Sequence, residues 1–172
     1  MYQQSYVRPV TCRAHYAWAV VSWLDEEEMR AWRGLIEVFH HLDAALEDEL
    51  LAAQGLTNSD YAVLVNLSEA VGHRLRMCDL AARMHLTPSG LTRRIDSLVK
   101  QGFVARQPAA DDRRVSFAVL TTKGLNKLER AAPVHVGSVR RHMLDKLSRN
   151  QIRQLGSVLA ALKKRWEQDD GL

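Results

Sequence analysis

The chain has 172 residues, of which 47% are hydrophobic and 26% are charged, and its formal net charge at pH 7 is +4. These values are ordinary for a globular domain with a real core, and they exclude disorder or a coiled coil over the whole length. The basic residues are concentrated, since positions 71–114 hold nine of them against four acidic residues. Such local positive charge is typical of a surface that binds a polyanion.

The start of the chain predicts no element of its own. Residues 1–17 show no clear period, so we treat them as an N-terminal extension before a single domain at 18–172. The apolar run at 16–24 is shorter than the ~20 residues that cross a bilayer, and an acidic block follows it instead of a cleavage site. With only two cysteines, no disulfide framework is indicated, and we expect a cytoplasmic protein without a membrane partner.

A long helix is predicted over about 24–54. Its first turn carries Asp25 to Glu28, negative charge that suits the positive end of the helix dipole. Apolar residues then recur every three or four positions, at Leu35, Phe39, Leu42, Leu46 and Leu50. Because a helix that is apolar on one face must bury that face, this stripe should pack against another element.

Two shorter helices follow. Thr57 and Asp60 form a capping box that opens a helix from 58 to about 70, and Gly72 ends it. A third helix is expected at about 77–84. It contains Cys78, which we expect to pack in the core, because a free cysteine behaves as a small hydrophobe. Redox sensing is the alternative for this thiol, since arginines lie close to it in sequence.

The next helix carries the main functional signal. Thr87 suits an N-cap, Pro88 suits the first helical position, and Gly102 suits the left-handed residue that follows a last turn. Leu91, Ile95 and Leu98 define a buried face, and polar residues lie elsewhere on the helix: Ser89, Thr92, Arg93, Asp96 and Lys100. Asp96 would repel a phosphate, so we expect it to pair with a neighbouring arginine. Two short helices joined by a tight turn, the second one basic, form the helix-turn-helix pattern.

A hairpin is expected directly after this helix. Apolar segments at 103–105 and 115–120 flank a polar tip that contains Arg113 and Arg114. A polar-faced helix followed by such a hairpin is a DNA-reading device, made of a recognition helix and a wing. The predicted fold is therefore mainly α with a small β-hairpin wing, a winged helix-turn-helix over about 57–120.

The C-terminal part is predicted to be helical over about 122–168. Pro133 removes one backbone hydrogen bond, so we expect a kink or a local break there. Ser148 and Gln151 form a capping box that opens a last helix with an apolar stripe. The helices at 24–54 and 122–168 have more apolar surface than a small winged helix can cover, so we expect them to dimerise. A two-fold dimer predicts an inverted-repeat DNA site with half-sites about one helical turn apart.

This order of elements, with the stretch LTPSGLTRRIDSLVKQGFVARQPAADDRRVSFAVLTTKG, resembles the MarR family of bacterial transcriptional regulators over about residues 24–166. Asp112-Arg113-Arg114 matches the family's wing signature, and Leu120 to Gly124 matches the motif that follows it. The resemblance implies that Arg114 reaches into the minor groove, that Asp112 holds the wing's geometry, and that the recognition helix faces the major groove.

The residues and the resemblance together predict one set of DNA-binding positions: Arg76, Thr87, Pro88, Ser89, Gly90, Thr92, Arg93, Arg94, Arg106, Asp112, Arg113 and Arg114. Arginine suits this role because its forked donors fit guanine and because it is drawn to a narrow minor groove. Two alternatives stay open. Arg93 and Arg94 would otherwise belong to a solvated helix face, and residues 111–114 to an ordinary polar turn.

Other ligands are weakly indicated. By resemblance, Trp32, Phe39 and His41 would line a pocket for a small aromatic or phenolic effector, although aromatic residues at helical spacing are more often core. The spacing of the histidines does not favour a metal site, and no cofactor is expected. The sequence has no phosphate-binding glycine loop, HExxH or GxSxG, so we expect no enzyme.

The predicted function is a homodimeric transcriptional regulator, acting as a repressor at a palindromic operator in double-stranded DNA. An effector that prefers a different separation of the two reading heads would release the DNA. Two alternatives are a constitutive architectural DNA-binding protein and a helical protein-interaction module whose basic patch meets an acidic partner.

Overall fold

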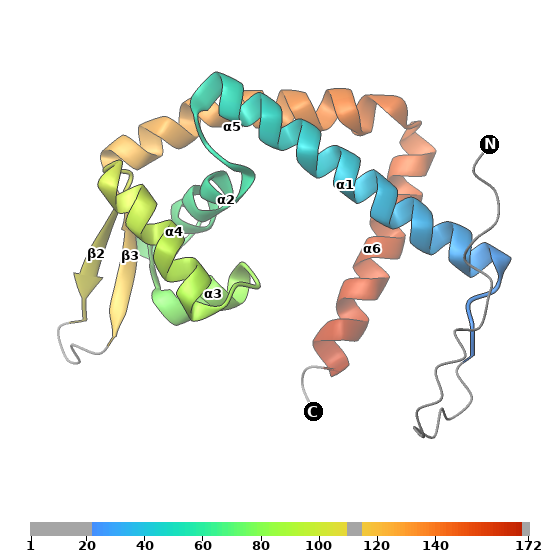
Figure 1. Cartoon of the computed structure of the whole chain (residues 1–172), viewed down its shortest axis with the longest axis horizontal. Coiled ribbons are helices and arrows are strands. Elements are labelled where there is room, and N and C mark those ends of the chain that lie inside the picture. Colours follow the sequence, from blue (N-terminus) through green and yellow to red (C-terminus); the bar gives the residue numbers. More distant parts are fainter. Residues whose placement is uncertain (1–21, 110–114, 170–172) are drawn as a thin grey trace, which may run out of the picture. The chain divides into compact units, whose positions relative to one another are not determined.

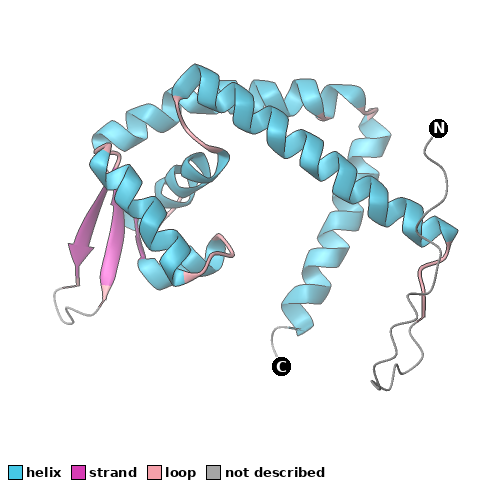
Figure 2. Cartoon of the chain, in the orientation of Figure 1, coloured by secondary structure: helices cyan, strands magenta, loops and turns pink. Residues whose placement is uncertain are grey.

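The computed structural model describes residues 22–109 and 115–169 (Figures 1 and 2). The fold is mostly helical with one small sheet, as predicted. The elements in chain order are α1 (Glu26–Gln54), α2 (Asn58–Ser68), the 3-10 turn η1 (Val71–His73), β1 (Arg74–Arg76), α3 (Met77–Arg83), α4 (Pro88–Lys100), β2 (Val104–Pro108), β3 (Ser116–Leu120), α5 (Thr122–His142), the 3-10 turn η2 (Leu144–Lys146) and α6 (Arg149–Asp169).

The chain divides into two compact units, residues 1–36 and 37–172, and α1 runs from the first into the second. The described part of the first unit is residues 22–36. Asp25 and Glu28 cap its helix reciprocally, because each backbone N–H donates to the other residue's carboxylate, at 2.9 and 2.8 Å. Large apolar side chains of this segment, including Trp32 and Leu35, are exposed.

The second unit contains a lobe, residues 56–120, which combines the helix-turn-helix with a three-stranded antiparallel sheet of order β1-β3-β2. Strands β2 and β3 form the predicted hairpin, with Val104 opposite Leu120 and Pro108 opposite Ser116. The third strand, β1, was not predicted. It has only three residues, too few for an alternating pattern to be seen in the sequence.

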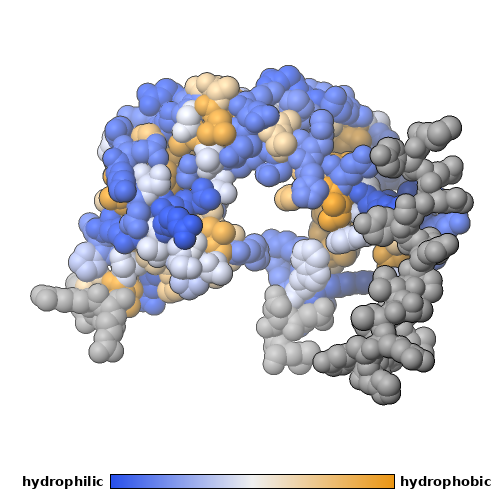
Figure 3. Space-filling view, viewed as in Figure 1, coloured by the Kyte–Doolittle hydropathy of each residue, from blue (hydrophilic) through white to orange (hydrophobic). Residues whose placement is uncertain are grey.

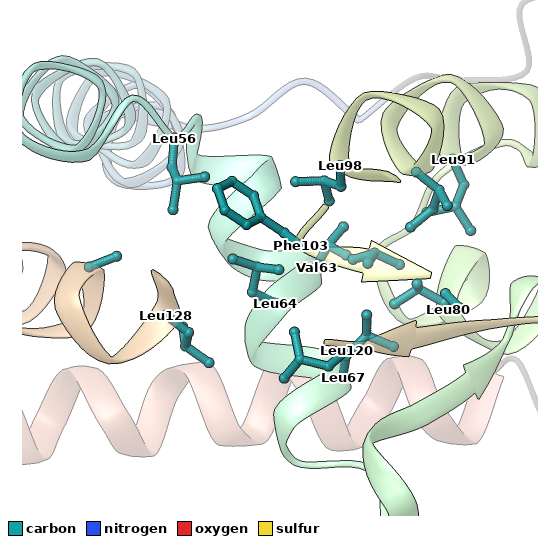
Figure 4. Packing of buried hydrophobic residues seen from close by; sticks show 14 of the residues in the cluster. Leu56, Val63, Leu64, Leu67, Leu80, Leu91, Leu98, Phe103, Leu120 and Leu128 are labelled. Atoms are coloured by element: carbon teal, nitrogen blue, oxygen red, sulfur yellow. The ribbon is translucent and has the colours of Figure 1, made fainter. Parts of the chain in front are cut away.

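One hydrophobic core fills the lobe. Figure 4 shows side chains from α2, α3, α4 and the strands meeting in it. The members that are at most 1% exposed come mainly from three helices: Val63, Leu64 and Leu67 of α2, Leu80 of α3, and Leu91, Ile95 and Leu98 of α4. The predicted buried face of α4 is therefore confirmed.

Both ends of α4 are fixed as the sequence predicted. The Thr87 hydroxyl accepts the Gly90 N–H at 3.2 Å, and Pro88 occupies the first turn. Gly102 has φ +76°, and the N–H groups of Gly102 and Phe103 donate to the carbonyls of the last helical turn at 2.9 and 3.0 Å. These two bonds form a Schellman motif, so α4 ends at a definite residue before the wing starts.

The C-terminal helices follow the prediction except at Pro133. Of the expected kink or local break at this proline, the break is wrong, because α5 continues through it as one helix. The capping box of Ser148 and Gln151 opens α6 as predicted, and the apolar stripe of α6 is largely exposed in the single chain.

Gly124, in the first turn of α5, has no room for a side chain. A Cβ there would overlap the Phe103 carbonyl oxygen and lie 2.9 Å from Cδ1 of Leu120. We expect Gly124→Ala to lower the free energy of unfolding by about 1–3 kcal/mol, because backbone must move to relieve the overlap. Asn126→Ala, on an exposed position of the same helix, should change it by less than about 0.5 kcal/mol. Urea unfolding followed by circular dichroism measures both, and equal stabilities would contradict this account.

Candidate nucleic-acid interface

The outward face of α4 is polar and exposed. With about 100° between successive residues, Ser89 and Arg93 lie opposite Leu91 and Ile95, Thr92 lies at the flank of that side, and all three are exposed. In the space-filling view of Figure 3, strongly hydrophilic residues are seen over α4. Hydroxyl groups and free N–H groups at a helix start suit phosphates, and an exposed arginine suits a base edge. This face has the chemistry that reads duplex DNA.

Two neighbouring arginines on α4 have different surroundings. Arg93 is exposed. Arg94 instead places Nη1 3.2 Å from Oδ1 of Asp60 and 3.2 Å from Oγ1 of Thr57. Its Nε is buried and has no hydrogen-bond partner among the described residues. The two arginines were predicted together as DNA contacts, but only Arg93 lies at the exposed surface. The guanidinium of Arg94 is directed to the start of α2.

Arg106, on β2, connects the hairpin to α4. Its Nη2 donates to Oδ1 of Asp96 at 3.0 Å and to the carbonyl of Thr92 at 3.3 Å. The prediction that Asp96 pairs with a neighbouring arginine is confirmed. The pair stays partly exposed, with 38% of the Arg106 side chain in solvent, so the arginine lies at the surface beside the reading face.

The remaining predicted DNA-binding residues fall into two groups. Arg76 is exposed at the residue that precedes α3. Asp112, Arg113 and Arg114 lie outside the described residues, as do residues 1–17. In the described part of the hairpin, the backbone N–H of Ala109 donates to the Val115 carbonyl at 2.9 Å.

The predicted effector residues are not gathered into a pocket. Trp32 and Phe39 are 54% and 60% exposed, and His41 is also exposed. Along α1, His41 lies about 200° from Phe39, on a different side of the helix. A pocket of about 360 Å³ opens elsewhere, between the end of α5 and the start of α6, and none of the three lines it.

Cys78 is exposed, so the expected packing of this cysteine in the core is wrong. Leu80 and Ala81 form the buried side of α3, and Cys78 and Asp79 lie on its exposed side. The Cys78 thiol lies 3.5 Å from the carboxylate of Asp79. Among the described residues, no group of three potential metal ligands is present.

A polar cluster between α1 and α5 had no signal in the sequence. The ring nitrogen Nε2 of His142 lies 2.8 Å from Oε1 of Glu49, and the Arg141 guanidinium donates to the other carboxylate oxygen. These interactions, above all the hydrogen bond from His142, lower the pKa of Glu49 to about 2. His135, which lies on the same helix, stacks on Tyr61 with 4.4 Å between ring centres. His142 and His135 thus each contact a neighbouring helix.

The lobe is a winged helix-turn-helix whose second helix has a polar face with an exposed arginine, and this fold defines a class of DNA-binding proteins. Residues 56–116 match the model of the MarR family. AbsC, a MarR family regulator from Streptomyces coelicolor, is 40% identical, with 85% of this chain and 98% of AbsC covered and a TM-score of 0.78. Sco3205 from the same organism, solved in complex with DNA, is 35% identical, with coverage of 84% and 94% and a TM-score of 0.78.

The chain belongs to the MarR family of transcriptional regulators, and it is a DNA-binding regulator. A curated relative, the HTH-type transcriptional repressor YetL of Bacillus subtilis, is 28% identical over 67% of this chain and 69% of YetL. These relatives are regulators of transcription and not enzymes. Within residues 22–109 and 115–169, no helix is both long and apolar enough to span a membrane.

The Glu49 cluster predicts a pH-dependent stability. Because the folded-state pKa of Glu49 lies below its ordinary value of 4.5, its contribution is complete above that value and is lost as the pH falls toward 2. We expect Glu49→Gln to be less stable than wild type at pH 7, with the difference shrinking between about pH 4.5 and 2. Unfolding by urea at several pH values measures this, and a difference that stays constant with pH would contradict it.

Arg93 gives a prediction for binding. Replacing it with glutamine should reduce the slope of log affinity against log salt concentration by about 0.9 on a mixed-sequence duplex of 30 base pairs, because one cation leaves the reading face. Lys146→Gln, which removes an exposed cation from η2, is the control and should leave the slope unchanged. Fluorescence anisotropy at several salt concentrations measures both slopes. A wild-type slope for Arg93→Gln would exclude Arg93 from the phosphate contacts on this duplex.

Proposed function

We propose that the protein is a homodimeric repressor that binds an inverted-repeat operator and is released by a small aromatic or phenolic effector. The observation that carries this proposal is the exposed polar face of α4, held opposite a fully buried apolar face. Because its target is DNA, we place its action in the cytoplasm. The naming of YetL as a repressor supports the direction of regulation.

Exposed apolar side chains support dimerisation. On α6, four of them lie within one arc of the helix: Val158, Leu159, Leu162 and Trp166. Residues 22–36 carry exposed apolar side chains of their own, among them Trp32 and Leu35. Monomeric proteins rarely leave contiguous apolar patches of this kind in water, and a second copy supplies the same patches by symmetry.

The proposed contacts with DNA divide by chemistry. Ser89, Thr92 and Arg93 face the major groove, with Thr87, Pro88 and Gly90 presenting the helix start to phosphate. Arg106 lies beside this face through its contacts with Asp96 and Thr92, and we also assign exposed Arg76 to the DNA-binding surface. Asp112, Arg113 and Arg114 are assigned to the wing in the minor groove. Two such heads related by two-fold symmetry would meet half-sites about 10 base pairs apart.

Release by an effector requires a ligand with different affinities for two arrangements of the dimer. We assign its pocket to Trp32, Phe39 and His41. Their exposure in the single chain means that a second copy or the ligand itself would cover them.

Selection from a library of random duplexes at physiological salt tests the operator. We expect one enriched palindrome, and light scattering of the purified complex should give two chains per duplex. Salt-sensitive retention without an enriched sequence would favour a constitutive architectural protein instead. No retained DNA would favour a protein-interaction module.

The effector is tested on the enriched palindrome with benzoate and phenol as probes. Displacement of the DNA by either one, reduced in Trp32→Ala, supports the assigned pocket. Binding that neither probe changes would contradict release by this class of ligand.

A further inference from the structure

We propose that Arg94 is a positioning residue for DNA binding and not a DNA contact. Its bonds to Asp60 and Thr57 fix the rotation of α4 about its own axis, which directs Arg93 to the DNA. The inference deepens the proposed function, because it rests on the reading role assigned to the outward face of α4.

The acceptor of Arg94 is the capping box of α2. Oδ2 of Asp60 accepts the Thr57 N–H at 3.3 Å, and the Thr57 hydroxyl accepts the Asp60 N–H at 3.0 Å. The other carboxylate oxygen of Asp60 and the same hydroxyl are the groups that Arg94 reaches. The Asp60 side chain is only 12% exposed and that of Arg94 29%, so the ion pair is partly shielded from water.

The start of α2 is held in turn by the second half of α1. The backbone N–H of Asn58 donates to Oε2 of Glu47 at 2.5 Å. The side-chain amide of Asn58 donates to the carbonyl and the carboxylate of Asp43, both at 3.0 Å. Arg94 therefore binds to a point that is itself fixed by several hydrogen bonds.

The direction of these bonds matters, because apolar packing and hydrogen bonds constrain a helix differently. Burial of Leu91, Ile95 and Leu98 decides which side of α4 faces the core, whereas hydrogen bonds have a preferred direction and hold the flank of the helix to a defined point. Arg94 lies about 60° from Leu91, at the flank of this buried face. Since Arg93 is 100° further round, a bond that holds Arg94 inward also holds Arg93 outward.

Asp60→Asn separates the two roles of Arg94, because it leaves the arginine in place and removes its anchor. If Arg94 only positions α4, we expect this variant to bind the wild-type palindrome about tenfold more weakly, with an unchanged salt slope. Arg94→Gln should show the same loss and the same slope, and the double variant should be no worse than either. Affinities come from fluorescence anisotropy at several salt concentrations.

A direct contact predicts the opposite pattern. Asp60→Asn would then bind as well as wild type or better, and Arg94→Gln would lower the salt slope by about 0.9. Either of these results overturns the proposal. Arg93→Gln, which should lower the slope, shows that the assay detects the loss of one cation.

Two controls keep the outcome interpretable. Circular dichroism establishes that each variant is folded, and Asp145→Asn breaks an exposed pair with Arg140 that is remote from α4 in sequence. If a single variant is unfolded, the double variant Asp60→Asn/Arg94→Gln replaces it, because it leaves no buried charge unpaired. If the proposed function is wrong, the wild-type protein will enrich no palindrome. The salt slopes of the Asp60 and Arg94 variants on a mixed-sequence duplex would still test the role of Arg94.

Discussion

The structure depends on one constraint, that α4 must bury one side completely while its opposite side stays polar. Leu91, Ile95 and Leu98 satisfy the first half by packing into the core of the lobe. The opposite side of α4 must carry polar residues, and Ser89 and Arg93 occupy it. The other helices of the lobe, the sheet and the caps of α4 all serve to hold this two-sided helix in place.

Local signals predicted the elements well. The N-caps at Thr57 and Thr87 and the left-handed Gly102 act within a few residues of themselves, so the sequence contains all the information needed to place them. The failures at β1 and Cys78 have the opposite cause. A strand of three residues exists only because β3 lies beside it, and the exposure of a thiol depends on which face of α3 meets the core.

The site shows the same division. The sequence correctly placed Arg93 on a polar face, because helical periodicity decides it. It could not separate Arg93 from Arg94, since the partner of Arg94 is 34 residues away and is met only in the folded lobe. Asp60 was visible as a capping residue, but its second oxygen was free to bind any cation that tertiary structure supplied. The wing tip and the effector residues remain predictions.

The bonds from Arg106 to Asp96 and to the Thr92 carbonyl join the hairpin to α4. The hairpin strand β2 and helix α4 are thus held relative to each other in the free protein. Association then loses less conformational entropy than it would with a freely hinged wing, and more of the contact energy is expressed as affinity.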